Sequence, residues 1–288
     1  MPGFLFEPGL FGVEYMKLCC SYRSAPQYRE IVDEIRYSLN ALGQALEALE
    51  KYPDKIIIIE ILDLEHSQVA YDKIKGLITE NPNIVIDCYK MRDYIVMSED
   101  PAFTKVMYHY PVNTYNDLWR VLYYKPWAVS IAEPLTFDMI RVRQAVDKSS
   151  DQHVRIRVLP TLGRPTEWNN LALVDNGLRH FWVTPETVGE YEGYIDVLDL
   201  YDEDEHREEA LIKVFHNGFY LMPLGSLVKN LNSSIPANMF DIPFIQKRMN
   251  CKQICMRDPS MCNYCATFEN IAQLTRPKTD SLIDLLKK

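Results

Sequence analysis

Short runs of β-branched, aromatic and other apolar residues alternate along the chain with longer stretches of helical hydrophobic spacing. The apolar runs predict strands at residues 15–21, 55–62, 84–89, 105–110, 127–132, 154–160, 180–183 and 194–200. The stretches between them predict helices at residues 26–51, 67–79, 93–103, 115–124, 137–148, 167–176, 185–191 and 204–216. Strands that alternate with helices in this way are typical of a parallel sheet with crossover connections.

Eight strand–helix alternations predict an α/β fold, with a closed (β/α)₈ barrel first and an open doubly wound sheet second. The sequence pattern changes after residue 218, where a stretch with several prolines leads to a group of cysteines and two helix-like segments. We therefore expect a barrel over residues 1–218. Residues 219–288 would form a cysteine-rich, helical metal-binding segment packed on the barrel.

Composition and charge narrow the range of partners. The 288 residues are 47% hydrophobic and 25% charged, which excludes collagen-like and wholly disordered chains. The net charge of −9 and the absence of a long Lys/Arg run argue against non-specific DNA binding. A structured RNA recognised by its shape remains a candidate partner, and so does another protein.

No apolar stretch reaches the length of about 18 residues that a transmembrane helix needs. The apolar opening of the chain also lacks the basic region of a signal peptide. We therefore expect a cytoplasmic protein that does not enter a membrane. In that reducing compartment, cysteines are more often thiols or metal ligands than disulfides.

Residues 251–265 read CKQICMRDPSMCNYC and carry the strongest chemical signal of the sequence. Four thiols follow the spacing C-x3-C-x6-C-x2-C: Cys251, Cys255, Cys262 and Cys265. Thiolates this close repel one another and are stabilised together by a metal. The compact spacing favours a [4Fe–4S] cluster, with a four-thiolate Zn²⁺ site as the alternative. The remaining thiols, Cys19, Cys20 and Cys88, fit a packed core, and the alternative is that one of them joins or supports a metal site.

Polar side chains gather where the predicted strands end, and in parallel α/β proteins the reaction centre lies beyond those ends. The acid/base candidates are His109, Glu60, Asp87 and Glu133, and Arg23 follows the first strand. His109 is the best general acid or base because imidazole titrates near neutral pH.

The segment VRIRVLP places Arg155 and Arg157 on one face of its strand, because side chains alternate along a strand. The apolar face should meet the helices, so both guanidinium groups would point into the barrel. We expect them to pair with Asp87, Glu60 and Glu133. Together with Arg23 they would bind an anionic or polar substrate, or they would fill the barrel with ion pairs.

The segment HFWVTPETVGEYEGYIDVLDLYDEDEHREEALIKVFHNG (180–218), with the cysteines that follow it, resembles the late barrel of the U32 peptidase-like family. The resemblance implies a β/α barrel and an iron–sulfur cluster, with a role in RNA or quinone hydroxylation or in proteolysis. The chain departs from the family in lacking its His-Gly-Ala-Met-Cys core and in grouping all four cysteines compactly near the C-terminus. The resemblance therefore assigns no catalytic residue.

Three functional hypotheses follow. The first is a [4Fe–4S] barrel enzyme that carries out redox modification, such as hydroxylation of an RNA base or a small molecule. The second is a non-catalytic interaction protein with a structural Zn²⁺ knot, whose strand-end charges would pair with one another. The third is a U32-like peptidase or other hydrolase that uses His109 with a strand-end carboxylate.

Overall fold

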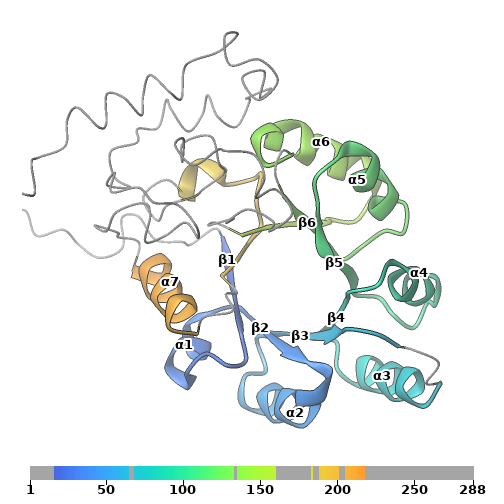
Figure 1. Cartoon of the computed structure of the whole chain (residues 1–288), viewed down its shortest axis with the longest axis vertical. Helices are drawn as coiled ribbons and strands as arrows, with labels where there is room; N and C mark the ends of the chain where they lie inside the picture. The colour runs from blue at the N-terminus through green and yellow to red at the C-terminus, as the bar shows by residue number, and fades with distance from the viewer. Residues whose placement is uncertain are drawn as a thin grey trace, which may run out of the picture.

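The computed structural model describes residues 16–64, 68–132, 135–159, 183, 188–200 and 205–217. Eight parallel strands close into a barrel in chain order (Figure 1). The strands are β1 (Lys17–Ser21), β2 (Glu34–Ser38), β3 (Ile56–Ile61), β4 (Ile84–Cys88), β5 (Val106–Val112), β6 (Ala128–Ile131), β7 (Arg155–Val158) and β8 (Val197–Asp199). The predicted (β/α)₈-type barrel is confirmed.

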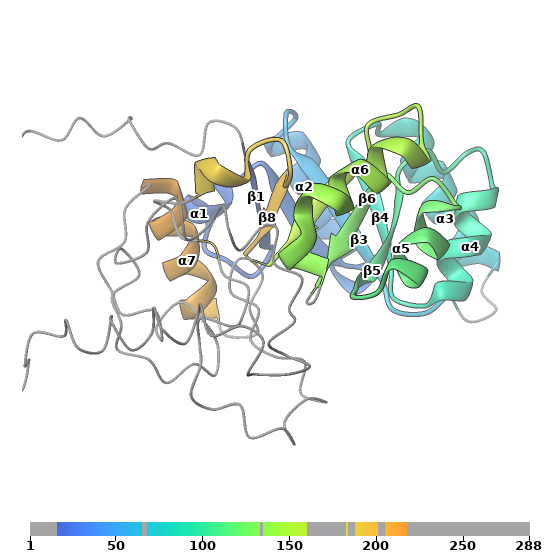
Figure 2. The same ribbon diagram turned by 90° about the horizontal axis from the view of Figure 1, so that it is seen from above.

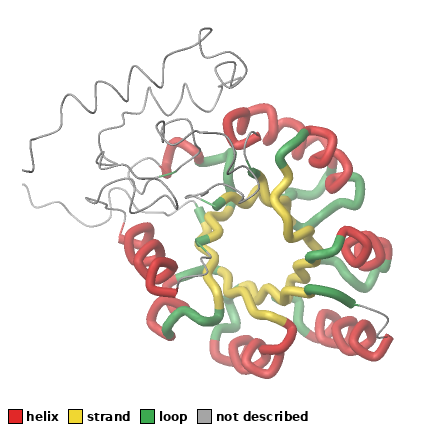
Figure 3. Tube along the Cα trace, in the orientation of Figure 1, coloured by secondary structure: helices red, strands yellow, loops and turns green. Residues whose placement is uncertain are grey.

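Helices surround the ring of strands, as Figures 1 and 3 show, and Figure 2 shows the same arrangement turned by 90°. The α-helices are α1 (Pro26–Ile31), α2 (Leu42–Lys51), α3 (Gln68–Glu80), α4 (Met91–Glu99), α5 (Tyr115–Leu122), α6 (Met139–Ser149) and α7 (Glu205–Asn217). Short 3₁₀ helices lie at η1 (Leu39–Ala41), η2 (Leu135–Asp138) and η5 (Val188–Tyr191). None of the helices described is long and apolar enough to cross a membrane.

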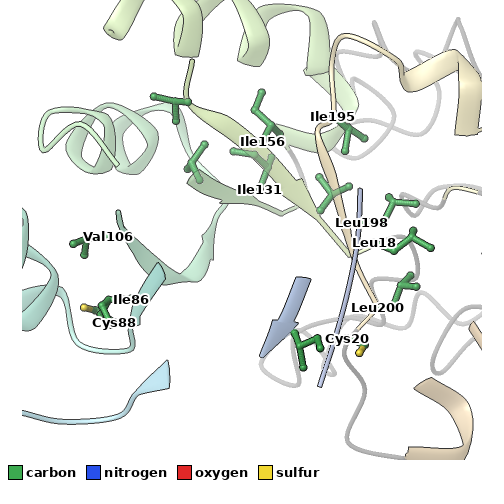
Figure 4. Packing of buried hydrophobic residues seen from close by; sticks show 14 of the residues in the cluster. Leu18, Cys20, Ile86, Cys88, Val106, Ile131, Ile156, Ile195, Leu198 and Leu200 are labelled. Carbon is green, nitrogen blue, oxygen red and sulfur yellow. The ribbon is translucent and has the colours of Figure 1, made fainter. Parts of the chain in front are cut away.

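The main core lies between the strands and the helices. Strand side chains such as Ile86, Ile156 and Leu198 are fully buried there, in the cluster that Figure 4 shows. Cys20 and Cys88 belong to the same core, as expected for packed thiols. Because both faces of each strand are covered, most strand positions are buried, as is typical of parallel sheets.

The opposite face of each strand points into the barrel. A second, smaller apolar cluster fills part of this interior; its buried members are Cys19, Ile58, Val85, Met107, Ala128 and Val197. Several other inward positions carry charge, including Arg36 on β2, Asp87 on β4 and Arg157 on β7, all of them buried. The barrel interior is therefore a packed apolar layer combined with an ionic network.

One strand differs from the prediction. Residues 26–51 were expected to form a single helix, but they form α1, then strand β2, then η1 and α2. Strand β2 places the apolar Ile35 and Tyr37 in the outer core and the charged Glu34 and Arg36 inside the barrel. Glu34 and Arg36 resemble the polar face of a helix, so the sequence pattern did not indicate a strand here.

The predicted strand at 180–183 is not among the described strands of the ring. Only Val183 of this segment lies in the described part of the chain, and it is in no strand. The expected number of eight strands is therefore reached with β2 in its place. The predicted helix at 167–176 and the cysteine-rich segment 219–288 both fall outside the described residues.

Helix α7 is fixed to the carboxyl end of β1 by a buried carboxylate. Glu208 Oε1 accepts hydrogen bonds from the backbone N–H of Ser21 and from the Ser24 hydroxyl, both at 2.6 Å. The neighbouring Glu209 accepts from the backbone N–H of Ala25 at 3.0 Å. The last described helix thus holds the loop that follows the first strand.

We predict that Glu208→Ala lowers the free energy of unfolding by about 2–4 kcal/mol, because two buried donors lose a charged acceptor. The matched control is Glu47→Ala on the exposed face of α2, with an expected change within about 0.5 kcal/mol. Urea unfolding followed by circular dichroism measures both variants. Equal stability of the two would show that Glu208 does not hold α7.

Candidate functional site

The candidate site lies at the carboxyl ends of β3, β4 and β5. His109 Nδ1 lies 2.8 Å from Asp87 Oδ2, and the imidazole is 21% exposed whereas the carboxylate is buried. The regular pairing of β5 with β4 ends at Tyr108, and its register with β6 shifts between Tyr108 and Val112. His109 therefore lies in a β-bulge, a feature that often aims a side chain at an active site.

Glu60 completes the group at the barrel mouth. It pairs with Asp87 across the β3–β4 ladder and is 14% exposed. Its Oε1 accepts from Arg36 Nη1 at 3.3 Å and from the Tyr89 hydroxyl at 3.4 Å. The structure thus brings together three of the four predicted acid/base residues, while Glu133 lies outside the described part of the chain.

Arg36 links this group to the interior of the barrel. Its Nη1 donates to Asp87 Oδ2 as well as to Glu60, and its Nη2 donates to Asp199 Oδ2 at 2.7 Å. Three carboxylates from three strands therefore converge on one buried guanidinium group.

The network continues to the amino end of the barrel through Arg157. This side chain is fully buried and donates to Glu34 through Nη1 and to Asp199 Oδ2 through Nη2, the latter at 3.1 Å. Arg155 Nη1 donates to Glu34 Oε1 at 3.1 Å, and its guanidinium stacks on the Trp127 ring. Both arginines point into the barrel as expected, but the expected carboxylate partners are wrong, because Glu34 and Asp199 take that role.

Asp87 and Asp199 remain ionised because of these pairs. Burial opposes ionisation of Asp87, but Arg36 and His109 outweigh it and hold the pKa of Asp87 below its ordinary value. Burial likewise opposes ionisation of Asp199, and Arg36 and Arg157 lower its pKa to about 2. Conversely, the carboxylates raise the pKa of Arg36 well above its ordinary value against the effect of burial.

These shifts predict loss of stability in acid. A carboxyl group whose pKa is lower in the folded state stabilises the fold above its unfolded pKa, and this contribution is lost as pH falls through the folded pKa. For Asp199 the window runs from about pH 4 down to about pH 2, with a loss on the order of 2 kcal/mol, and Asp87 adds to it. Urea unfolding at successive pH values measures the slope. Asp199→Asn should flatten it, and an unchanged slope would contradict this assignment.

The side chains at the barrel mouth also include a set that could hold a divalent metal ion. One ligand atom from each of Glu60, Asp87 and His109 lies within 4.8 Å of the others, and two carboxylates with an imidazole suit such an ion. However, Arg36 Nη1 already contacts both carboxylates, so a guanidinium group supplies the positive charge that a metal ion would bring. The trio is therefore better arranged for proton transfer than for metal binding.

Of the remaining predicted residues that the structure describes, Arg23 is not part of this group. Arg23 is exposed after β1, where its backbone N–H and its Nε donate to Ser21 Oγ. Cys251, Cys255, Cys262 and Cys265 lie outside the described residues. Burial raises the pKa of the Cys19 and Cys88 thiols well above the ordinary value, and burial also raises that of Cys20. These three are therefore buried core thiols.

Sequence reasoning missed Arg36, Glu34 and Asp199, which hold the network together. A signal for two of them was present. Glu34 and Arg36 flank an isoleucine at a spacing of two residues, as Arg155 and Arg157 do in the strand that was recognised. A pair of inward charges on one strand calls for a complementary pair on another, because an unpaired buried charge is costly. The EIRYS run could therefore have been read as the partner of VRIRV.

Neither the family models nor the curated proteins with which the chain was compared contain a match. The resemblance to the U32 peptidase-like family therefore stays a prediction. Of the residues 180–187 that open the resembling segment, only Val183 lies in the described part of the chain.

Proposed function

We propose that the chain is a β/α-barrel enzyme that carries out general acid–base catalysis on a small polar substrate at the carboxyl ends of β3 to β5. The observation that carries this proposal is the 2.8 Å contact between Asp87 Oδ2 and His109 Nδ1, with the imidazole partly exposed at the mouth. A buried carboxylate that orients a histidine is a recurring arrangement for a general base.

The positions of the protons and the balance of charges in the network support this role. Asp87 is ionised and can only accept a hydrogen bond, so Nδ1 of His109 carries a proton in this contact, and Nε2 faces away from Asp87. The network contains the four carboxylates of Glu34, Glu60, Asp87 and Asp199 against the three guanidinium groups of Arg36, Arg155 and Arg157. One negative charge is left over when His109 is neutral. A proton accepted at Nε2 would balance it.

His109 would take a proton from the substrate or from a water molecule and return it later. Glu60, whose oxygen lies near the imidazole at the mouth, would accept or donate a second proton. If the attacking group is water, the reaction is a hydrolysis. If the proton comes from a carbon next to a carbonyl group, the reaction is an isomerisation or an elimination.

The test is a panel of esters, amides, hydroxy acids and ketones incubated with the protein in D₂O. Proton NMR follows both hydrolysis and exchange of carbon-bound hydrogen. We expect at least one compound class to be turned over by the unaltered chain and not by His109→Ala. The matched control is His153→Ala, because His153 also lies 2.8 Å from an aspartate, Asp196, but at the amino end of the barrel. Equal loss in both variants would contradict the proposal.

The cysteine segment remains part of the proposal as a cofactor site. With Cys19, Cys20 and Cys88 held as buried thiols, the candidates for a cluster are Cys251, Cys255, Cys262 and Cys265. Four cysteines in one short run suit a [4Fe–4S] cluster, which would add electron transfer to the acid–base chemistry and permit redox modification of an RNA base or a small molecule.

We predict that protein purified without oxygen is brown, with a broad band near 400 nm and about four irons per chain. Iron, zinc and sulfide analysis measures the content. Replacing all four cysteines by serine should remove the band. A colourless protein with about one zinc per chain would instead indicate a structural Zn²⁺ site.

A second candidate function is a non-catalytic interaction protein, and one observation favours it. Arg157, Glu34 and Asp199 are buried and bonded to one another, as a barrel filled with ion pairs requires. That interpretation treats His109 and Glu60 as the outer end of the same structural network. Turnover that is lost in His109→Ala and kept in His153→Ala would exclude it.

A further inference from the structure

His109 lies where the regular pairing of β5 is interrupted. The ladder between β4 and β5 ends at Tyr108, one residue earlier. The ladder to β6 resumes at Val112, so His109 lies within the irregular stretch. The Asp87 contact holds the imidazole at one ring nitrogen, on the edge of the ring, and covers neither of its faces.

Tyr89 supplies the missing contact. Its ring stacks on the imidazole of His109 with centroids 3.5 Å apart and planes 13° from parallel. Its hydroxyl donates to Glu60 Oε1 at 3.4 Å. One side chain therefore touches both groups to which we assign proton transfer.

The backbone of Tyr89 is itself firmly placed. Its N–H donates to the carbonyl of Ile61 at 2.9 Å, which joins it to the strand that carries Glu60. It also follows β4 directly, two residues after Asp87. Strand β4 thus offers His109 two fixed contacts, a carboxylate at the ring edge and an aromatic ring on its face.

We infer that Tyr89 is the positioning residue of this site, holding the His109 imidazole and the Glu60 carboxylate in one arrangement and covering one face of the imidazole. Tyr110 meets the same imidazole edge-on, with centroids 5.4 Å apart. With one face covered and Nδ1 occupied, the substrate proton reaches His109 along the Nε2 edge. This inference rests on the proposed function for its catalytic meaning, but its structural content can be measured without any substrate.

The two contacts of Tyr89 can be separated by substitution. Tyr89→Phe keeps the ring stack and removes the hydroxyl bond to Glu60, whereas Tyr89→Leu removes both. Tyr123→Leu is the matched control, because Tyr123 is 78% exposed on the outer surface. If Tyr89→Leu fails to fold, Tyr89→Met keeps a side chain of similar length without an aromatic face.

The first readout is the tautomer of His109 in the full chain labelled with ¹⁵N-histidine, with His109→Gln used to assign its signals. We expect Nδ1–H in the unaltered chain, in Tyr89→Phe and in Tyr123→Leu. We expect a mixture with Nε2–H in Tyr89→Leu, because the ring can then turn away from Asp87. A Tyr89→Leu spectrum that keeps the Nδ1–H form would overturn the inference, whether or not a substrate is known.

The second readout uses whichever compound the substrate panel identifies. Tyr89→Leu should lower kcat by about 10- to 100-fold with little change in KM, since a misplaced catalytic group costs rate rather than binding. Tyr89→Phe should recover most of that loss. If His109→Ala leaves turnover unchanged while the tautomer still depends on Tyr89, the proposed function fails and the positioning contact stands. If turnover depends on His109 but neither readout responds to Tyr89→Leu, the inference fails and the proposed function stands.

Discussion

Replacement of Arg157 by Met is expected to destabilise the barrel by about 3–5 kcal/mol, which for a typical domain is a large share of its stability. Arg157 is fully buried and bridges Glu34 on β2 to Asp199 on β8. Methionine fills much of the volume but supplies no positive charge. Glu34 and Asp199 would then remain in the interior with one guanidinium fewer to compensate them.

The cost arises from the charges left behind rather than from the lost pair. Taking an ion out of water costs several kcal/mol, and a buried ion pair offsets this only when both partners are present. Glu34 keeps Arg155 and Asp199 keeps Arg36, so the barrel should retain its fold rather than lose it entirely. The expected outcome is a folded but much less stable chain.

Urea unfolding of Arg157→Met and the unaltered chain measures the difference. Arg141→Met is the matched control, since Arg141 is 61% exposed and lies 3.7 Å from Asp138. An exposed pair of this kind contributes at most about 1 kcal/mol. If the two variants were equally stable, the interior network would contribute no more than a surface ion pair. The stabilising role assigned to Arg157 would then be wrong.

The strands that could be predicted from the sequence are those whose outward and inward residues are mostly apolar. The IIII run of β3 and the IVI run of β4 are covered on both faces, so they read as strands whatever their neighbours do. Strand β2 reads differently because Glu34 and Arg36 alternate with Ile35 and Tyr37. Such a strand is recognisable only when the opposite charges inside the barrel are known, and those lie far away in the sequence.

The same reason limits what could be predicted of the site. Glu60, Asp87 and His109 are visible because each ends an apolar run, and strand ends meet at one edge of a parallel sheet. The partners of Arg157 were assigned to that edge, but the guanidinium reaches Glu34 near the amino end of β2. Arginine is long enough to bridge two layers of a barrel, so strand order and spacing do not determine its partner.

If the proposed function holds, depth within the network separates the residues expected to act on catalysis from those expected to act on stability. Arg157 is fully buried, whereas the side chains of Glu60 and His109 are 14% and 21% exposed. A substitution near the amino end should therefore act on the free energy of unfolding. A substitution at the mouth should act on rate, because a partly exposed group can be rehydrated when its partner is lost.

His109→Ala is accordingly expected to lower kcat by about 10²- to 10⁴-fold on whichever compound the panel identifies, the usual contribution of a general acid or base. Asp87→Asn should lower kcat less, because the imidazole remains and loses only its orienting carboxylate. Steady-state kinetics on each variant measures both effects. Urea unfolding is needed beside them, since Asp87 also pairs with Arg36.

The double variant distinguishes a catalytic pair from two separate groups. If Asp87 acts through His109, then Asp87→Asn adds no further loss of kcat once the imidazole is gone, and the double variant matches His109→Ala. If the two losses multiply instead, Asp87 acts on the reaction by itself, and the orienting role drawn from the 2.8 Å contact is wrong. Arg36 would then be the remaining link between Asp87 and the mouth, because it contacts Asp87 and Glu60 through the same nitrogen.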